Sequence, residues 1–184
     1  YLFTIPIENA SSFHEIKDIK INQKLYINWK TKFLTTIEQS YKKAPYYLNT
    51  HKIIQTLFEK EYTTISELSI ESCLLISNYL KINTKFEISS QKYSQNKGLK
   101  KEERINDILK INNSKTYINT IAGKELYNKN QFLEANINLH FMKSNNINYK
   151  QFNNEFVPWL SIIDVLMFNS VEEIKTMLNN YELV

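Results

Sequence analysis

The chain has 184 residues, enough for one domain with a buried core, and its formal net charge is only +4. Arg104 is the only arginine among 23 basic residues, so the arginine forks typical of nucleic-acid interfaces are excluded and no nucleic-acid partner is expected. No apolar run approaches the roughly 18 to 20 residues of a membrane span, and no secretory signal is visible, so no span is expected.

The first elements are predicted to be two short strands. Residues 1–7 alternate apolar and polar side chains up to a proline, and residues 16–21 alternate in the same way. The two patterns predict a hairpin-like pair. The chain opens with Tyr1, already inside a strand-like pattern, which leads us to expect that an amino-terminal segment is missing.

Three helices are predicted to follow. Apolar residues recur at helical spacing in residues 29–41, 53–58 and 74–80. Pro45 ends the first of these helices and is expected in the first turn of the second. Cys73 lies in the third, where we expect a small, buried and unreactive side chain. A single cysteine cannot form an internal disulfide, which is consistent with a reducing cytoplasm as the location.

In the second half of the chain, strand patterns alternate with helical ones. Strands are predicted over residues 84–89, 115–120 and 136–142, and helices over 99–111 and around 124–127. This order predicts an α/β fold with a mixed, partly parallel sheet, packed helices, and a helix-rich middle and carboxyl terminus. We expect a single domain over residues 1–184.

Two serines near the end are predicted to cap helices. Ser161 precedes an apolar helix with Asp164 in its third position, and Ser170 precedes the last helix with Glu173 in the same place. Both are capping-box patterns, in which the hydroxyl accepts a hydrogen bond from a backbone amide of the first turn. We therefore interpret Ser161 as a structural cap rather than a catalytic nucleophile.

The first candidate site is the polar segment 89–104, where a predicted strand ends and a helix begins near a glycine. Free amides, the helix dipole and nearby lysines would together suit an anion. The alternative is a solvated basic loop, since no P-loop pattern is present. The candidate phosphate-binding residues are Ser89, Ser90, Lys97, Gly98, Lys100, Lys101 and Arg104.

The second candidate site follows the next strand. Asn119, Thr120 and the backbone of Gly123 are expected at the carboxyl end of that strand, where ligands of open α/β sheets bind, and beside the first loop. The alternative is a glycine needed only for the turn. The three histidines stand far apart without metal-ligand spacing, so no metal site is predicted and no cofactor is indicated.

Three blocks of the sequence resemble the WbqC-like family of bacterial proteins. The segment 41–47 is similar to its Y-x-x-A-P-[YF] helix junction, and 156–164 to its F-[IV]-P-x-L-S-x-[IL]-D ending. Between them, the serine pair at 89–90 and the later run to Tyr127 are similar to its serine, K-x-x-R-[IL] and Y-x-x-G motifs. The family's H-Q-P-x-[YF]-x-P-W and D-D-x-Q segments are absent, and lysine stands at Lys101 where the family has Thr or Ser.

The resemblance implies a role in bacterial surface polysaccharide or O-antigen synthesis. It implies acyl or aminoacyl transfer, glycyl transfer included, to a nucleotide-linked amino sugar. The alternative is a non-catalytic binding or scaffold protein that uses the aromatic helix junction as its contact face. Tyr46, Tyr47 and Trp159 suit either a core or an interface. The expected partner is a sugar nucleotide or another phosphorylated small molecule. Such an analogy rests on association and assigns no catalytic residue.

Overall fold

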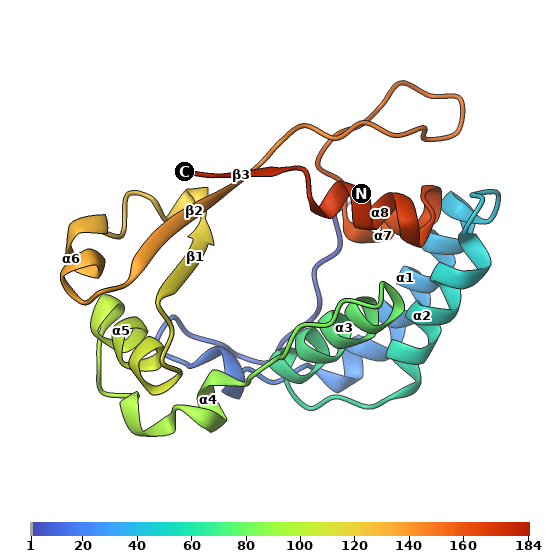
Figure 1. The fold of residues 1–184 in the computed structure, drawn as a ribbon. Helices are drawn as coiled ribbons and strands as arrows, with labels where there is room; N and C mark the ends of the chain where they lie inside the picture. The colour runs from blue at the N-terminus through green and yellow to red at the C-terminus, as the bar shows by residue number, and fades with distance from the viewer. Residues whose placement is uncertain (1) are drawn as a thin grey trace. The chain divides into compact units, whose positions relative to one another are not determined.

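The computed structural model describes residues 2–184, with the backbone alone at Lys101. The chain divides into two compact units (Figure 1). The first comprises Tyr1–Thr84 and Asn148–Met177, and the second comprises Lys85–Ile147 and Leu178–Val184. The chain thus leaves the first unit, builds most of the second, and then returns. The single domain expected over the whole chain stays a prediction.

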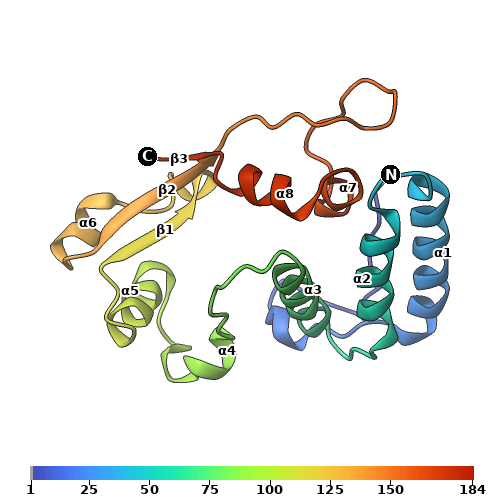
Figure 2. The same ribbon diagram turned by 45° about the vertical axis from the view of Figure 1, so that its right-hand side comes forward.

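The first unit is helical. Figure 2 shows α1 and α2 side by side, and their shared interface is aromatic: the rings of Trp29 and Phe33 stack with centroids 5.2 Å apart, and Phe33 meets Phe58 edge-on at 5.5 Å. Burial of these side chains from water is the main stabilising contribution. The helices are α1 (Gln23–Tyr41), α2 (Tyr47–Glu59), α3 (Ile65–Tyr79), α7 (Ile162–Phe168) and α8 (Val171–Leu178).

The three amino-terminal helices confirm the helical spacing of the sequence, but Pro45 lies outside the second helix. Tyr46 is the N-cap of α2, so Pro45 stands one residue before the cap. It separates the helices without entering the first turn of α2. Cys73 is exposed, which corrects the expectation of a buried thiol. It lies about 140° around α3 from the buried Leu68, away from the packed face.

The two strands predicted at the start of the chain are reduced to isolated bridges. Ile7 pairs with Ile21 antiparallel, and Lys20 pairs with Thr64. Residues Ile16–Asp18 form a short 3-10 helix instead of a strand. Ile21 is buried whereas Ile16 is 72% exposed, so only one end of the alternating pattern has a core to face.

The second unit is built on a three-stranded sheet in the order β1-β2-β3. The strands are β1 (Thr116–Thr120), β2 (Asn138–Ser144) and β3 (Tyr181–Leu183). β1 and β2 are parallel, and β2 and β3 are antiparallel. This mixed, partly parallel sheet confirms the α/β fold class.

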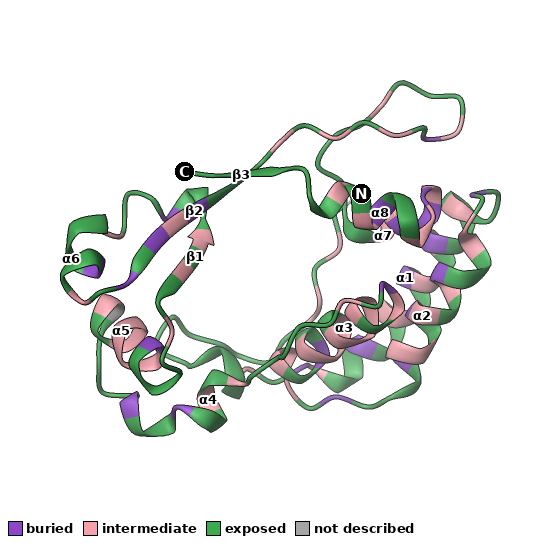
Figure 3. Cartoon of the chain, in the orientation of Figure 1, coloured by how far each residue is buried: buried purple, intermediate pink, exposed green. Residues whose placement is uncertain are grey.

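One face of this sheet is covered by helices. The buried side chains of Leu139 and Phe141 on β2 pack with Leu109 and Phe132 in one apolar cluster. Leu109 comes from α5 (Lys101–Ile111) and Phe132 from α6 (Lys129–Glu134). Figure 3 shows buried positions on β2 separated by an intermediate one, as expected for a strand with one covered face.

Two local predictions for this unit are wrong. Residues 84–88 form no strand, and Phe86 is 49% exposed, so its alternation lacks a core; the chain then enters α4 (Ser89–Lys92) and a 3-10 turn, η2 (Ser94–Asn96). The short helix expected near 124–127 is instead a 3-10 turn, η3 (Ile121–Gly123). The sequence pattern also missed β3, whose three residues are all exposed.

Within residues 2–184, no helix has both the length and the apolar character that crossing a bilayer requires. The longest is α1, with 19 residues, and it carries several charged side chains. This finding agrees with the absence of a span predicted from the sequence.

The start of α3 offers a test of local stability. Thr64 accepts a hydrogen bond from the backbone of Glu67 at 3.2 Å, and the Glu67 carboxylate accepts one from the backbone of Thr64 at 3.0 Å. Thr64→Ala removes the cap and is expected to lower the free energy of unfolding by about 1 kcal/mol. Urea denaturation measures this; Thr31→Ala, in the middle of α1, is the control and should change stability by less than about 0.5 kcal/mol.

Candidate functional site

The strongest candidate site is an open cavity of about 430 Å³ in the second unit. It lies just after the carboxyl end of β1, and residues 124–129 form most of its wall. It also reaches Phe141 on the neighbouring parallel strand. Phe141 pairs with Asn119 in the sheet. Ligands of open α/β sheets bind at this end of the strands.

The lining of this cavity carries both signs of charge. Lys124 and Lys129 supply ammonium groups, and Glu102 and Glu125 supply carboxylates. The Lys129 Nζ lies 5.7 Å from the centroid of the Phe141 ring, a cation–π arrangement that holds the amine at the cavity wall. Leu126, Tyr127 and Asn128 complete the lining. A ligand with separate anionic and cationic or hydroxyl groups matches this lining.

The two candidate segments from the sequence reach this cavity only through residues that were not selected as candidates. Glu102, in the first turn of α5, lies inside the first candidate segment but was not selected from it, and Lys124 directly follows Gly123 of the second. None of the nine selected residues whose side chains the structure describes lines the cavity itself. The lysines that do line it, Lys124 and Lys129, were missed because basic residues were selected only in the first segment. In the second segment the site was placed on Asn119, Thr120 and Gly123.

The two glycines have different surroundings. A Cβ on Gly98 would meet nothing within 4 Å, whereas one on Gly123 would lie 2.8 Å from the Asn119 Nδ2. Neither glycine has a positive φ. Gly123 is therefore explained by the close approach of the Asn119 carboxamide, whose Oδ1 also accepts from the backbone of Thr120 at 2.8 Å. A turn that only glycine could adopt is not the reason.

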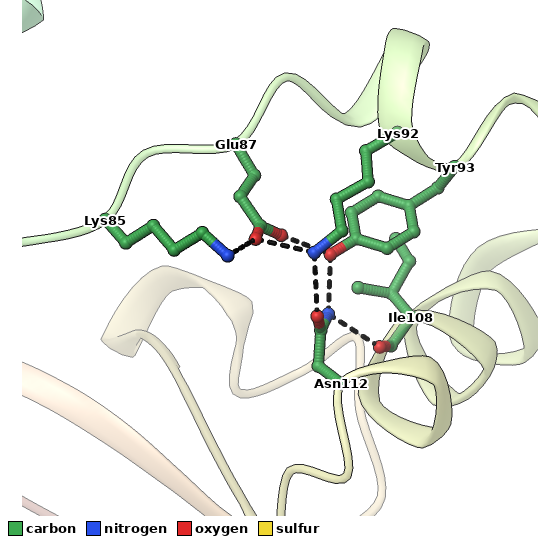
Figure 4. A network of polar contacts seen from close by, with 6 residues as sticks. All are labelled: Lys85, Glu87, Lys92, Tyr93, Ile108 and Asn112. Carbon is green, nitrogen blue, oxygen red and sulfur yellow. Dashed lines mark hydrogen bonds and ion pairs between the residues drawn. The ribbon is translucent and has the colours of Figure 1, made fainter.

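The first candidate segment is organised around a carboxylate (Figure 4). Glu87 accepts from Lys85 at 2.8 Å and from Lys92 at 2.6 Å, and the hydroxyl of Tyr93 also donates to it. Lys92 further donates to Asn112 at 3.1 Å. These hydrogen bonds, led by that from Lys85, lower the pKa of Glu87 to about 2. The network ties α4 to the end of α5.

Arg104 also makes a side-chain hydrogen bond within the second unit. Its Nε donates to Asn96 at 3.1 Å, and the Asn96 amide donates to Asp107 at 3.2 Å. Asn96 is almost fully buried. The guanidinium thus braces the turn before α5 through one of its nitrogens, and this structural role is present without any ligand.

The remaining residues of the first segment are spread along its surface. Ser89 opens α4 and is exposed, Ser90 is half-buried, and Lys97 and Lys100 are exposed. The side chain of Lys101 lies outside the described part of the chain. Lys100 is the N-cap residue of α5 and makes no side-chain capping bond. The solvated-loop alternative and the anion-site alternative both remain compatible with these positions.

Sequence reasoning also missed a buried acid in the first unit. Asp164 is 3% exposed, and its carboxylate accepts from Tyr41 at 2.9 Å, from Tyr149 at 2.6 Å and from Gln151 at 2.8 Å. Burial, reinforced by the hydrogen bond to Asp164, raises the pKa of both tyrosines. The sequence signal that could have indicated this cluster is that Tyr41 and Asp164 both lie in blocks that resemble the family.

Asp164 therefore does not serve the capping box that the sequence predicts. Ser161 caps α7 by accepting from the backbone of Ile163 at 3.3 Å, which confirms its structural role. Ser170 and Glu173 do form the predicted reciprocal pair, at 3.2 and 2.7 Å. Among the described residues, no three His, Cys, Asp or Glu side chains converge to hold a metal ion.

The Glu87 network predicts a pH dependence of stability. Because its pKa is lower in the folded chain than the ordinary 4.5, the carboxylate stabilises the fold fully above about pH 4.5 and loses this contribution as the pH falls towards 2. Glu87→Gln should therefore lower Tm at pH 7, and its difference from the wild type should shrink through this window. Glu61→Gln is the control; a difference independent of pH would contradict the prediction.

The Asp164 cluster predicts the effect of losing one donor. Tyr149→Phe removes the 2.6 Å hydrogen bond and leaves a buried carboxylate with fewer partners, so the free energy of unfolding should fall by about 1.5 to 3 kcal/mol. Chemical denaturation followed by circular dichroism measures this. Tyr181→Phe, on an exposed strand, should be nearly neutral, and equal effects for the two variants would refute a special role of Asp164.

Comparison with known proteins identifies the family. The model of the WbqC-like protein family matches residues 1–176. No curated protein and no solved structure matches the chain significantly. The family match begins at residue 1 and gives no support to the expectation of a missing amino-terminal part. With almost the whole chain covered and both ends of the Tyr41–Asp164 contact inside the match, this chain belongs to the WbqC-like protein family.

Proposed function

We propose that this protein binds a phosphorylated small molecule, of the sugar-nucleotide class, in the cavity at the end of β1. The observation that carries the proposal is the pair of lysines, Lys124 and Lys129, lining a cavity of about 430 Å³ beside a parallel strand pair. Small-molecule sites commonly have volumes of about 300 to 1,000 Å³. Lysine ammonium groups bind phosphate as point charges.

The carboxylates of the cavity favour an amino sugar over a simple phosphate. Glu102 and Glu125 would repel a ligand that carried only negative charge. A nucleotide-linked amino sugar presents its diphosphate to the lysines, while its hydroxyls and amine donate to the carboxylates. Tyr127, half-buried at the cavity, offers a flat apolar surface for a ring.

The residues selected from the sequence would support this site from its two flanks. In this proposal Lys97 and Lys100, before α5, and Lys101, at its first position, add positive charge. Ser89, Ser90, Gly98 and Arg104 shape that loop. Asn119, Thr120 and Gly123 set the exit of β1. The cavity lysines are the primary anion contacts, because they line the volume that the ligand would fill.

The reaction that we propose is acyl or aminoacyl transfer, glycyl transfer included, in bacterial surface polysaccharide or O-antigen synthesis in the cytoplasm. The uncharged amine of the bound sugar attacks the carbonyl of an activated donor and an amide forms. The donor's carrier leaves with the electron pair of the broken bond, and the proton of the amine passes to the carrier or to water. Membership of the WbqC-like family supports this assignment.

A second candidate is a non-catalytic binding or scaffold protein of a polysaccharide assembly complex. The observation that favours it is Trp159, which is 80% exposed and held at a φ of +60°. A non-glycine residue in the left-handed region is uncommon, and an exposed tryptophan is typical of contact surfaces. Tyr46 and Tyr47 are half-buried, so Trp159 rather than the helix junction would provide the contact.

Isothermal titration calorimetry with a panel of nucleotide-linked amino sugars tests ligand binding. The double variant Lys124→Ala/Lys129→Ala should lose at least about tenfold in affinity, because each lost charge contact contributes on the order of 1 kcal/mol or more. Lys110→Ala/Lys143→Ala, which removes two exposed lysines outside the cavity lining, should bind as the wild type does.

Two further results separate the alternatives. Loss of binding in Lys97→Ala/Lys100→Ala with retention in the cavity variant would move the anion site to the first segment. Mass spectrometry of the protein incubated with the bound sugar nucleotide and acyl or aminoacyl donors tests transfer. Binding without any amide product across the donors would support the scaffold function.

A further inference from the structure

Another cavity lies in the first unit. It shares no lining residue with the charged cavity of the second unit. It has a volume of about 220 Å³ and is walled by α2, α3 and α7. Ile53 and Leu57 line it from α2, Leu75 and Ile76 from α3, and Ile163 from α7. No ionisable side chain belongs to its described lining.

The few polar groups of this lining already have partners. The Thr50 hydroxyl donates to the Leu166 carbonyl at 2.9 Å, and the Ser72 hydroxyl donates to the Ser69 carbonyl at 2.8 Å. The Ser161 hydroxyl accepts from the backbone of Ile163 as the cap of α7. A polar ligand would lose its hydration here and gain little, whereas an apolar one gains by leaving water.

The size of the cavity sets it apart from an ordinary packing defect. Protein interiors contain few voids larger than a water molecule. An engineered apolar cavity of about 150 Å³ stays dry and binds benzene, so a cavity of this larger volume accommodates a larger apolar group. The cavity is not closed by the fold, because two of its lining residues, Ser161 and Ile162, are exposed at the start of α7.

The neighbouring surface continues the apolar character outwards. Leu160 is 44% exposed and Ile162 38% exposed, on either side of Ser161. A chain that entered here would pass exposed apolar side chains before it reached the interior. A polar head group would stay in water outside the opening.

We propose that this cavity binds a single alkyl chain, as found in a medium-length fatty acid, inserted from the start of α7 with its polar end in solvent. The proposal concerns the first unit alone and does not depend on the sugar-nucleotide site. The ligand is recognised by chain length and by the absence of charge along the chain.

Titration calorimetry of the full chain with n-alkanols from n-butanol to n-dodecanol, each below its solubility limit, tests the assignment. Affinity should rise about fourfold per methylene while the chain is still entering the cavity, and should then level off when the cavity is full. Saturable one-to-one binding with such a plateau is expected. No saturation, or a rise that continues without a plateau, would show partitioning onto the surface and overturn the proposal.

Two variants connect the binding to this cavity. Leu75→Phe fills the space and should weaken n-decanol binding at least tenfold, while Leu48→Phe, on the exposed face of α2, should bind as the wild type does. Leu57→Ala enlarges the space and should move the plateau to longer alkanols. If Leu75→Phe does not fold, the Leu57→Ala shift decides; an unchanged plateau in that variant would refute the site.

Two further probes distinguish a free fatty acid from a two-chain lipid as the source of the alkyl chain. Decanoate represents a free fatty acid, and dioctanoylphosphatidylcholine below its micellar concentration represents a two-chain lipid. Because the cavity takes one chain, decanoate should bind more tightly than the lipid. Tighter binding of the two-chain lipid would contradict the single-chain assignment.

Discussion

The buried carboxylate of Asp164 is the constraint on which the first unit depends. Its three donors come from α1, through Tyr41, and from the returning segment, through Tyr149 and Gln151. Tyr41 and Asp164 are 123 residues apart in sequence. A buried charge without a cation is stable only when its hydrogen bonds are satisfied, so α1, the returning segment and α7 must all be in place together.

This constraint explains how the chain accommodates its second unit. The chain leaves the first unit after Thr84 and returns at Asn148, and the carboxylate cluster lies shortly after the return. Gln151 extends the closure by exchanging two hydrogen bonds with the backbone of Val157, at 2.7 and 3.1 Å. The residues between Thr84 and Asn148 form most of the second unit, including the strand ends beside the charged cavity. The apolar cavity is formed by helices of the first unit, which the Asp164 hydrogen bonds hold together.

The sequence predicted the elements that have a strong period and missed those fixed by distant partners. The spacing of α1 and the alternation of the strand at Thr116–Thr120 were visible because each has one face that is more buried than the other. Phe33 and Ile37 are buried on α1, and Tyr117 is partly buried on the strand. The segment 84–88 alternates equally well but has no surface to pack on. Asp164 was interpreted as a helix-cap residue, since nothing local shows that Tyr149 and Tyr41 reach it. Lys124 and Lys129 belong to no recognisable sequence motif. Their position at the cavity became visible only with the parallel pairing of β1 and β2.

Hydrogen exchange measured by mass spectrometry on Asp164→Asn tests the central claim most directly. An amide at this position replaces one of the two carboxylate oxygens with a donor. Either Tyr41, or Tyr149 together with Gln151, therefore loses its acceptor while the side-chain volume is kept. We expect faster exchange in the last turn of α1, in residues 148–152 and in α7. Unchanged protection in all three segments would contradict the account, because it would mean that the first unit closes without the Asp164 hydrogen bonds.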